Sequence, residues 1–199
     1  MAALLLQEIA TRKATEDAMQ GLTETDLKSG QNLIDSMVLD KPDVHALDVD
    51  AQGVVLVTCG ICQRIGPIFK NYTQTSLLNL NPHIITIALN GGALLLANDS
   101  PLSRGLREDR VIIEHIRQAS RGNGMKTAAL LAHAPCAATE PYRFSLLKVI
   151  DLLVKAKARL KWELVGMKAA CFLGMPGGNT YFVSQKKWDA WVASQGPAL

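Results

Sequence analysis

The sequence lacks long hydrophobic runs, a strong net charge and a high content of aromatic residues. No apolar stretch approaches the roughly 20 residues of a membrane-spanning helix, so we expect no membrane segment. The formal net charge is only +3, and basic residues are interspersed with acidic ones, which argues against a nucleic-acid-binding protein. Aromatic residues make up 5% of the chain and hydrophobic residues 48%, a composition typical of a folded globular protein.

Cysteine is scarce, with four residues in 199, and no export signal is recognisable. Residues 2–6 are too short for the core of a signal peptide and lack a basic lead-in. We therefore expect a cytoplasmic, reducing location. There, cysteines are more often metal ligands or buried thiols than disulfides.

From residue 53 onward, short apolar runs alternate with amphipathic segments. Runs at 53–58, 83–89, 127–132 and 169–173 predict strands, and a turn at 177–179 indicates an additional edge strand at 181–183. Helices are predicted at about 110–121 and 143–162. This alternation is typical of an α/β fold with a mainly parallel sheet of four or five strands flanked by helices. Residues 1–50 predict an N-terminal helical arm, and residues 51–199 the α/β domain.

Metal-ligand side chains follow two of the predicted strands. Cys59 follows the first strand, and His133 and Cys136 follow the third. The carboxyl ends of parallel strands share one edge of the sheet, where ligands bind in such folds. Thiolates and imidazole are the ligands that zinc prefers. A His-x-x-Cys pair alone is a weak signal, because a buried histidine can lie beside a cysteine by chance, but its position after a strand favours a metal site.

This arrangement resembles the β-class carbonic anhydrases, whose Cys-x-Asp-x-Arg and later His-x-x-Cys motifs bind one zinc ion. Residues 53–59, the Asn-Gly-Gly turn at 90–92 and residues 131–137 match the family's motifs in order and approximate spacing. The resemblance implies that fold, a homodimer or higher homo-oligomer, and Zn²⁺ held by Cys59, His133 and Cys136. It also implies zinc-bound hydroxide that attacks carbon dioxide, with carbon dioxide and bicarbonate as small-molecule partners and no nucleic acid or membrane.

The family's acidic and basic pair is missing. Ile61 and Gln63 stand where the family has aspartate and arginine. Isoleucine cannot accept the hydrogen bond from zinc-bound hydroxide that the aspartate accepts in the family, so we expect weak or lost lyase activity. Arg64 lies one position beyond the family's arginine and is a candidate catalytic residue, with a role on a helix surface as the alternative.

Cys62 leaves two geometries open. As a fourth zinc ligand it would close the coordination shell, which predicts a non-catalytic, zinc-stabilised scaffold or interaction protein. Packed in the core instead, it leaves a position for water and hence for catalysis. A redox dithiol formed by Cys59 and Cys62 is a weaker third interpretation. Cys171, within an apolar run, is predicted to lie in the core.

Overall fold

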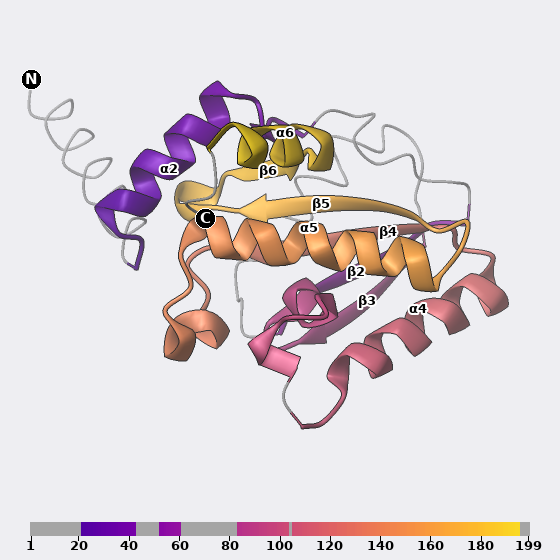
Figure 1. The fold of residues 1–199 in the computed structure, drawn as a ribbon. Helices are drawn as coiled ribbons and strands as arrows, with labels where there is room; N and C mark the ends of the chain where they lie inside the picture. The colour runs from indigo at the N-terminus through magenta and orange to yellow at the C-terminus, as the bar shows by residue number, and fades with distance from the viewer. Residues whose placement is uncertain (1–20, 43–51, 61–82, 104, 196–199) are drawn as a thin grey trace, which may run out of the picture.

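The computed structural model describes residues 21–42, 52–60, 83–103 and 105–195 (Figure 1). Their elements, in chain order, are α2 (Glu24–Asp35), β1 (Leu39–Asp40), β2 (Val54–Cys59), β3 (Ile84–Leu89), η1 (Gly92–Leu96), η2 (Pro101–Ser103), α4 (Glu108–Asn123), β4 (Thr127–His133), η3 (Ala137–Tyr142), α5 (Leu146–Glu163), β5 (Lys168–Gly174), η4 (Pro176–Gly178), β6 (Thr180–Val183) and α6 (Gln185–Gln195).

Six strands form one sheet in the order β1-β6-β5-β4-β2-β3. The pairs β2–β3, β2–β4 and β4–β5 are parallel, whereas β6 pairs antiparallel with β5 and β1. The predicted α/β fold with a mainly parallel sheet is therefore confirmed. The predicted strands correspond to β2 to β6. The additional strand, β1, contains only two residues and is too short to give a recognisable sequence pattern.

Alternating side chains of the strands build two apolar clusters. Val55 and Val57 of β2 belong to the larger cluster, to which α4 and α5 contribute their buried faces. Val54 and Leu56 belong to a smaller cluster on the opposite face of the sheet, together with Phe172 of β5. Every residue of β2 is buried, which explains its continuous apolar sequence.

β3 is less buried than β2, although its sequence is similarly apolar. It is the last strand in the sheet order and only Ile87 in it is buried. A continuous apolar run therefore does not distinguish a central strand from an edge strand in this chain.

α2 and β1 join the N-terminal part of the described chain to the core. Leu33 of α2 and Val38 beside β1 are fully buried in the larger cluster. Thr23 and Asp26 form a capping box at the start of α2, and Asp26 Oδ1 also accepts a hydrogen bond of 2.7 Å from the Leu146 amide of α5. Residues 24–40 thus pack on the sheet domain. The predicted division at residue 50 stays a prediction, since residues 1–20 and 43–51 lie outside the described ranges.

α4 and α5 run beside the sheet and end near its amino-terminal edge (Figure 1). α4 ends at Asn123 and is followed by Gly124, whose φ of 70° is left-handed, as the glycines at 122 and 124 predict for the end of a helix. α5 begins after Ser145, whose side chain accepts a hydrogen bond from the Lys148 amide. None of the helices in the described ranges is both long and apolar enough to cross a membrane.

Candidate metal centre

The ends of two adjacent parallel strands bring the three predicted ligands together. Cys59 is the last residue of β2, His133 is the last residue of β4, and Cys136 immediately precedes η3. Because β2 pairs with β4 in parallel, both strands deliver these residues to the same edge of the sheet. The possible ligand atoms of the three side chains all lie within 4.8 Å of one another. The structure therefore brings all three side chains together at one edge of the sheet, and their role as metal ligands stays a prediction.

The imidazole of His133 is oriented by a neighbouring carbonyl. Its Nδ1 lies 2.7 Å from the Pro135 carbonyl oxygen, which can only accept a hydrogen bond, so Nδ1 carries the proton. Nε2 is then left with a lone pair. This nitrogen is buried and has no hydrogen-bond partner among the residues that the structure describes. A metal-binding histidine commonly donates its second N–H to a carbonyl in this way.

The spacing of the two thiols fits zinc. Sγ of Cys59 and Sγ of Cys136 are 3.8 Å apart. Two thiolates at about 2.3 Å from one tetrahedral zinc ion lie about 3.8 Å apart, so this edge of the coordination shell is already present. The donor set of two sulfurs and one imidazole nitrogen also suits zinc better than it suits magnesium or calcium, which prefer oxygen ligands.

Burial governs the chemistry of the thiols. Cys59 is 2% exposed and Cys136 is 5% exposed. The hydrogen bond with Cys59 and burial together raise the pKa of Cys136 well above its ordinary value. Both sulfurs are thiols rather than members of a disulfide. Cys136 therefore stays protonated at neutral pH unless a cation compensates the charge of its thiolate.

The turn after β3 supports the end of β2. A Cβ atom added to Gly92 would lie 2.4 Å from the Thr58 carbonyl carbon and 2.5 Å from the Cys59 nitrogen. Gly60, directly after β2, donates its amide hydrogen to the carbonyl of Leu89, the last residue of β3, at 2.9 Å. Cys59 is therefore held by direct backbone contact with the turn, and glycine is required at position 92.

The loop that carries Cys136 is fixed from both sides. The Ala134 amide donates to the Gly174 carbonyl at 2.9 Å, which extends the β4–β5 pairing past His133. Thr139 donates its hydroxyl hydrogen to the Cys136 carbonyl at 2.8 Å. These contacts hold the two ligands of the His-x-x-Cys loop in a defined orientation without any metal.

The remaining predicted site residues divide into two groups. Ile61, Cys62, Gln63 and Arg64 lie outside the described ranges, so the fourth-ligand and catalytic roles stay predictions. Cys171 lies in the core as predicted, donates to the Leu153 carbonyl at 3.4 Å and has its pKa raised to about 12 by burial.

Sequence reasoning missed the orienting role of the Pro135 carbonyl and the contact made by Gly92. A backbone carbonyl leaves no signal in the sequence. The paired glycines at 91 and 92 indicated a turn but not the strand that it contacts.

Comparisons with protein-family models and with curated proteins find no match. Among solved structures, a β-carbonic anhydrase from the protozoan Trichomonas vaginalis is similar, with 11% sequence identity and a TM-score of 0.45, over 81% of this chain and 98% of that one. A carbonic anhydrase from Streptococcus mutans is similar with 14% identity and a TM-score of 0.41, over 79% of this chain and 95% of that one. Both structures bear the name of the enzyme whose motifs this sequence resembles.

Proposed function

We propose that Cys59, His133 and Cys136 hold one zinc ion and that the protein is a zinc lyase which hydrates carbon dioxide. The observation that carries the proposal is the buried Nε2 of His133, which has no hydrogen-bond partner within the described ranges and lies in one group with two thiols 3.8 Å apart. A buried nitrogen without a partner is costly, and a metal ion would satisfy it. Three protein ligands are typical of catalytic zinc sites, whereas structural sites have four.

The side chains of the site have separate roles in this proposal. Zinc in such a set lowers the pKa of a bound water to about 7 and so supplies a nucleophile at neutral pH. Deprotonated Cys59 and Cys136 would balance the two positive charges of the ion. The Pro135 carbonyl keeps His133 in the tautomer that presents Nε2. The apolar burial around both cysteines excludes bulk water from their side of the site.

Carbon dioxide is the substrate to test first, because the motifs at 53–59, 90–92 and 131–137 resemble those of β-class carbonic anhydrases. Ile61 offers no acceptor for a hydrogen bond from the nucleophile, so we expect a turnover well below that of an enzyme with the complete motif. The same resemblance supports a homodimer or larger homo-oligomer in the cytoplasm, where the thiols stay reduced. Sedimentation of the purified protein tests the oligomeric state.

The decisive experiment measures zinc content and carbon dioxide hydration on the same purified samples. We expect about one zinc per chain and slow hydration in the native protein, and loss of both in Cys136→Ser. Cys171→Ala is the matched control, because Cys171 is buried outside the group, and it should keep both. A folded protein that refuses added zinc would contradict the metal site. Full zinc occupancy without hydration would contradict the lyase activity and leave the metal site standing.

A further inference from the structure

A polar hollow lies at the opposite end of the sheet from the candidate metal centre. Its volume is about 500 Å³, and it is lined by Arg117, Ser120 and Arg121 of α4, Lys126, Glu163 and the loop at 164–167. Lys126 directly precedes β4, and the loop directly precedes β5. β4 spans seven residues at about 3.3 Å each, so the hollow is roughly 20 Å from the end of the strand that carries His133.

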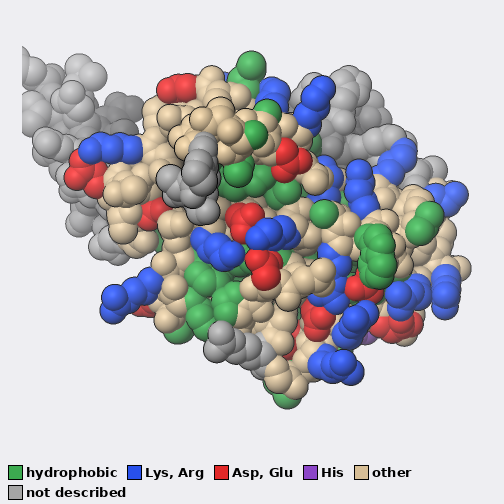
Figure 2. Space-filling view, in the orientation of Figure 1, with side chains coloured by type: hydrophobic (Ala, Val, Ile, Leu, Met, Phe, Trp, Pro, Cys, Tyr) green, Lys and Arg blue, Asp and Glu red, His purple; other side chains and the backbone are tan. Residues whose placement is uncertain are grey.

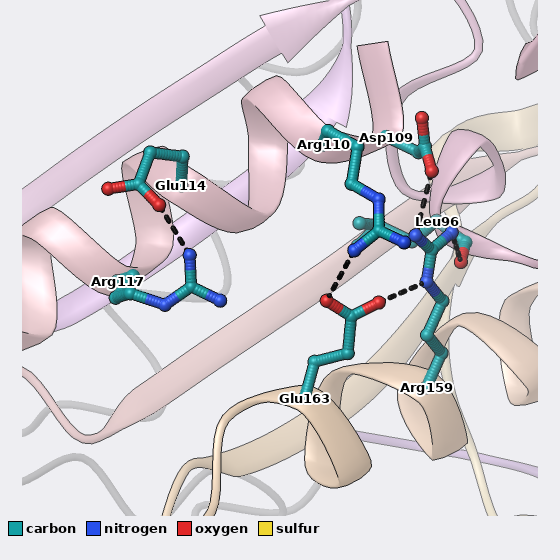
Figure 3. A network of polar contacts seen from close by, with 7 residues as sticks. All are labelled: Leu96, Asp109, Arg110, Glu114, Arg117, Arg159 and Glu163. Atoms are coloured by element: carbon teal, nitrogen blue, oxygen red, sulfur yellow. Dashed lines mark hydrogen bonds and ion pairs between the residues drawn. The ribbon is translucent and has the colours of Figure 1, made fainter. Parts of the chain in front are cut away.

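The acidic residue of the hollow is already neutralised. Glu163 Oε1 accepts a hydrogen bond of 2.8 Å from Arg159 Nε, and Glu163 Oε2 accepts one of 3.1 Å from Arg110 (Figure 3). The Glu163 side chain is only 9% exposed. Arg159 in turn bonds Asp109 at 2.7 Å and the Leu96 carbonyl at 3.1 Å. These two arginines and two carboxylates balance one another, so Glu163 contributes no net negative charge to the hollow.

Two cations of the hollow are not neutralised by a carboxylate of the described residues. Arg117 pairs with Glu114 (Figure 3), but Arg121 and Lys126 form no ion pair with any residue in the described ranges. Figure 2 shows lysine and arginine side chains gathered over α4 and the end of α5, with acidic and hydrophobic side chains among them. Arg121 lies in the last turn of α4, where a cation also offsets the helix dipole. Lys126 lies beyond Gly124, outside the last turn of α4, so compensation of the helix dipole does not account for this cation.

We propose that this hollow binds a small ligand that carries a phosphate group. Guanidinium and ammonium groups together with a hydroxyl from Ser120 are the donors that phosphate recognition uses. The volume is within the range of small-molecule sites and exceeds what one inorganic phosphate fills. Val165, 94% exposed, and Leu164 offer an apolar surface to the rest of the ligand. The cations surround a hollow instead of forming a long stripe, which favours a small ligand over a nucleic acid.

Isothermal titration calorimetry on the full chain at low ionic strength tests the site with three probes. The probes are adenosine monophosphate, inorganic phosphate and adenosine. We expect one site per chain for adenosine monophosphate and no binding of adenosine, because the phosphate supplies the recognised charge. Tighter binding of adenosine monophosphate than of phosphate supports an organic phosphate as ligand, and equal affinities support free phosphate in the same site. Absence of saturable binding by both phosphate probes would overturn the proposal.

Variants locate the binding and separate it from the metal centre. Arg121→Met and Lys126→Met should each weaken the binding of adenosine monophosphate at least tenfold. Arg121→Lys keeps the positive charge and should therefore lose less affinity than Arg121→Met. Lys41→Met is the matched control, because Lys41 is exposed and lies outside the hollow, and it should bind normally. Binding unchanged in both hollow variants would place the ligand elsewhere and refute the proposal. Cys136→Ser should keep its affinity for the probe, so failure of the zinc proposal would not affect this result.

Discussion

His133 depends on a backbone atom two residues away for its orientation. The Pro135 carbonyl at 2.7 Å from Nδ1 fixes the proton on that nitrogen and leaves the buried Nε2 as an acceptor. Most buried polar atoms in proteins have a hydrogen-bond partner, so an oriented nitrogen without one is an unusual feature. At the scale of single residues, this nitrogen is the observation that most supports the proposed ligand set.

A substitution at Gly92 tests whether the turn after β3 supports Cys59 at the end of β2. Gly92→Ala places a methyl group 2.4 Å from the Thr58 carbonyl carbon at a φ of 51°, so the turn or the end of β2 must shift. We expect the free energy of unfolding to fall by about 2–4 kcal/mol and the affinity for zinc to fall with it. Urea unfolding and a competition assay with a zinc chelator measure the two quantities.

Gly122→Ala is the control for that substitution. Gly122 lies in α4 with no atom within 4 Å of an added Cβ, and alanine favours the helix, so stability should rise by up to about 1 kcal/mol. Equal stability losses in the two variants would show that the turn does not support Cys59 in the way described.

The positions of the candidate ligands could be predicted from the sequence because Cys59 and His133 directly follow apolar runs and Cys136 comes three positions after His133. Cys59 and His133 come at strand ends, and parallel strands deliver their carboxyl ends to one edge. The tautomer of His133 could not be predicted, since it depends on a carbonyl that approaches only after the loop at 134–136 has folded. The ion pair that neutralises Glu163 could not be predicted from the sequence either, because its partner Arg110 is 53 positions away in the chain.

At the scale of elements, Asp26 joins the start of α2 to the start of α5. Its side chain caps α2 with Thr23 and accepts the Leu146 amide hydrogen at 2.7 Å, while the residue is only 6% exposed. Asp26→Ala removes the cap and leaves a buried amide without a partner. We expect the free energy of unfolding to fall by about 2–4 kcal/mol in urea unfolding. Asp35→Ala, at an exposed position of the same helix, should change it by less than about 0.5 kcal/mol. A similar loss in both variants would contradict the joining role.

The ion-pair network between α4 and α5 makes stability depend on pH. Burial raises the pKa of Asp109, but the hydrogen bond and charge of Arg159 together with the Arg110 amide outweigh burial and lower it. A carboxylate with a lowered pKa in the folded state stabilises the protein above its ordinary value of 3.8, and this stability is lost as the pH falls through the folded value.

Asp109→Asn tests the network. The variant should be less stable than the native protein at pH 7. The difference should shrink when thermal unfolding is repeated at pH values below 3.8, because the native Asp109 is progressively protonated as the pH falls through its lowered folded pKa. A difference that stays constant with pH would assign the effect to packing instead of charge.

The order of strands could be predicted only in part from these elements. Apolar runs and turn residues predict β2 to β6 and the end of α4. β1 could not be predicted because two residues carry no periodicity, and it forms only where β6 offers an antiparallel partner. The edge position of β3 also depends on the arrangement of the whole sheet rather than on its own residues.

At the scale of the whole molecule, a bound zinc ion would connect two strands of the central sheet. A ligand at about 1,000 times its dissociation constant adds about 4 kcal/mol to stability. For a chain of 199 residues, that corresponds to an increase of about 8–16 °C in Tm. Differential scanning calorimetry of zinc-loaded and chelator-treated protein measures the shift. Cys136→Ser should show no shift, and a shift of the same size in that variant would contradict the proposed ligand set.

The distance along the chain between the two proposed sulfur ligands has a consequence for biosynthesis. Cys59 and Cys136 are 77 positions apart, so at about 5–20 residues per second the ribosome adds the second thiol about 4–15 s after the first. A metal ion bound before Cys136 is added would have an incomplete set of ligands, and a metal other than zinc could bind to that partial set. Correct loading would then depend on which metals surround the nascent chain during those seconds, as well as on the geometry of the finished fold.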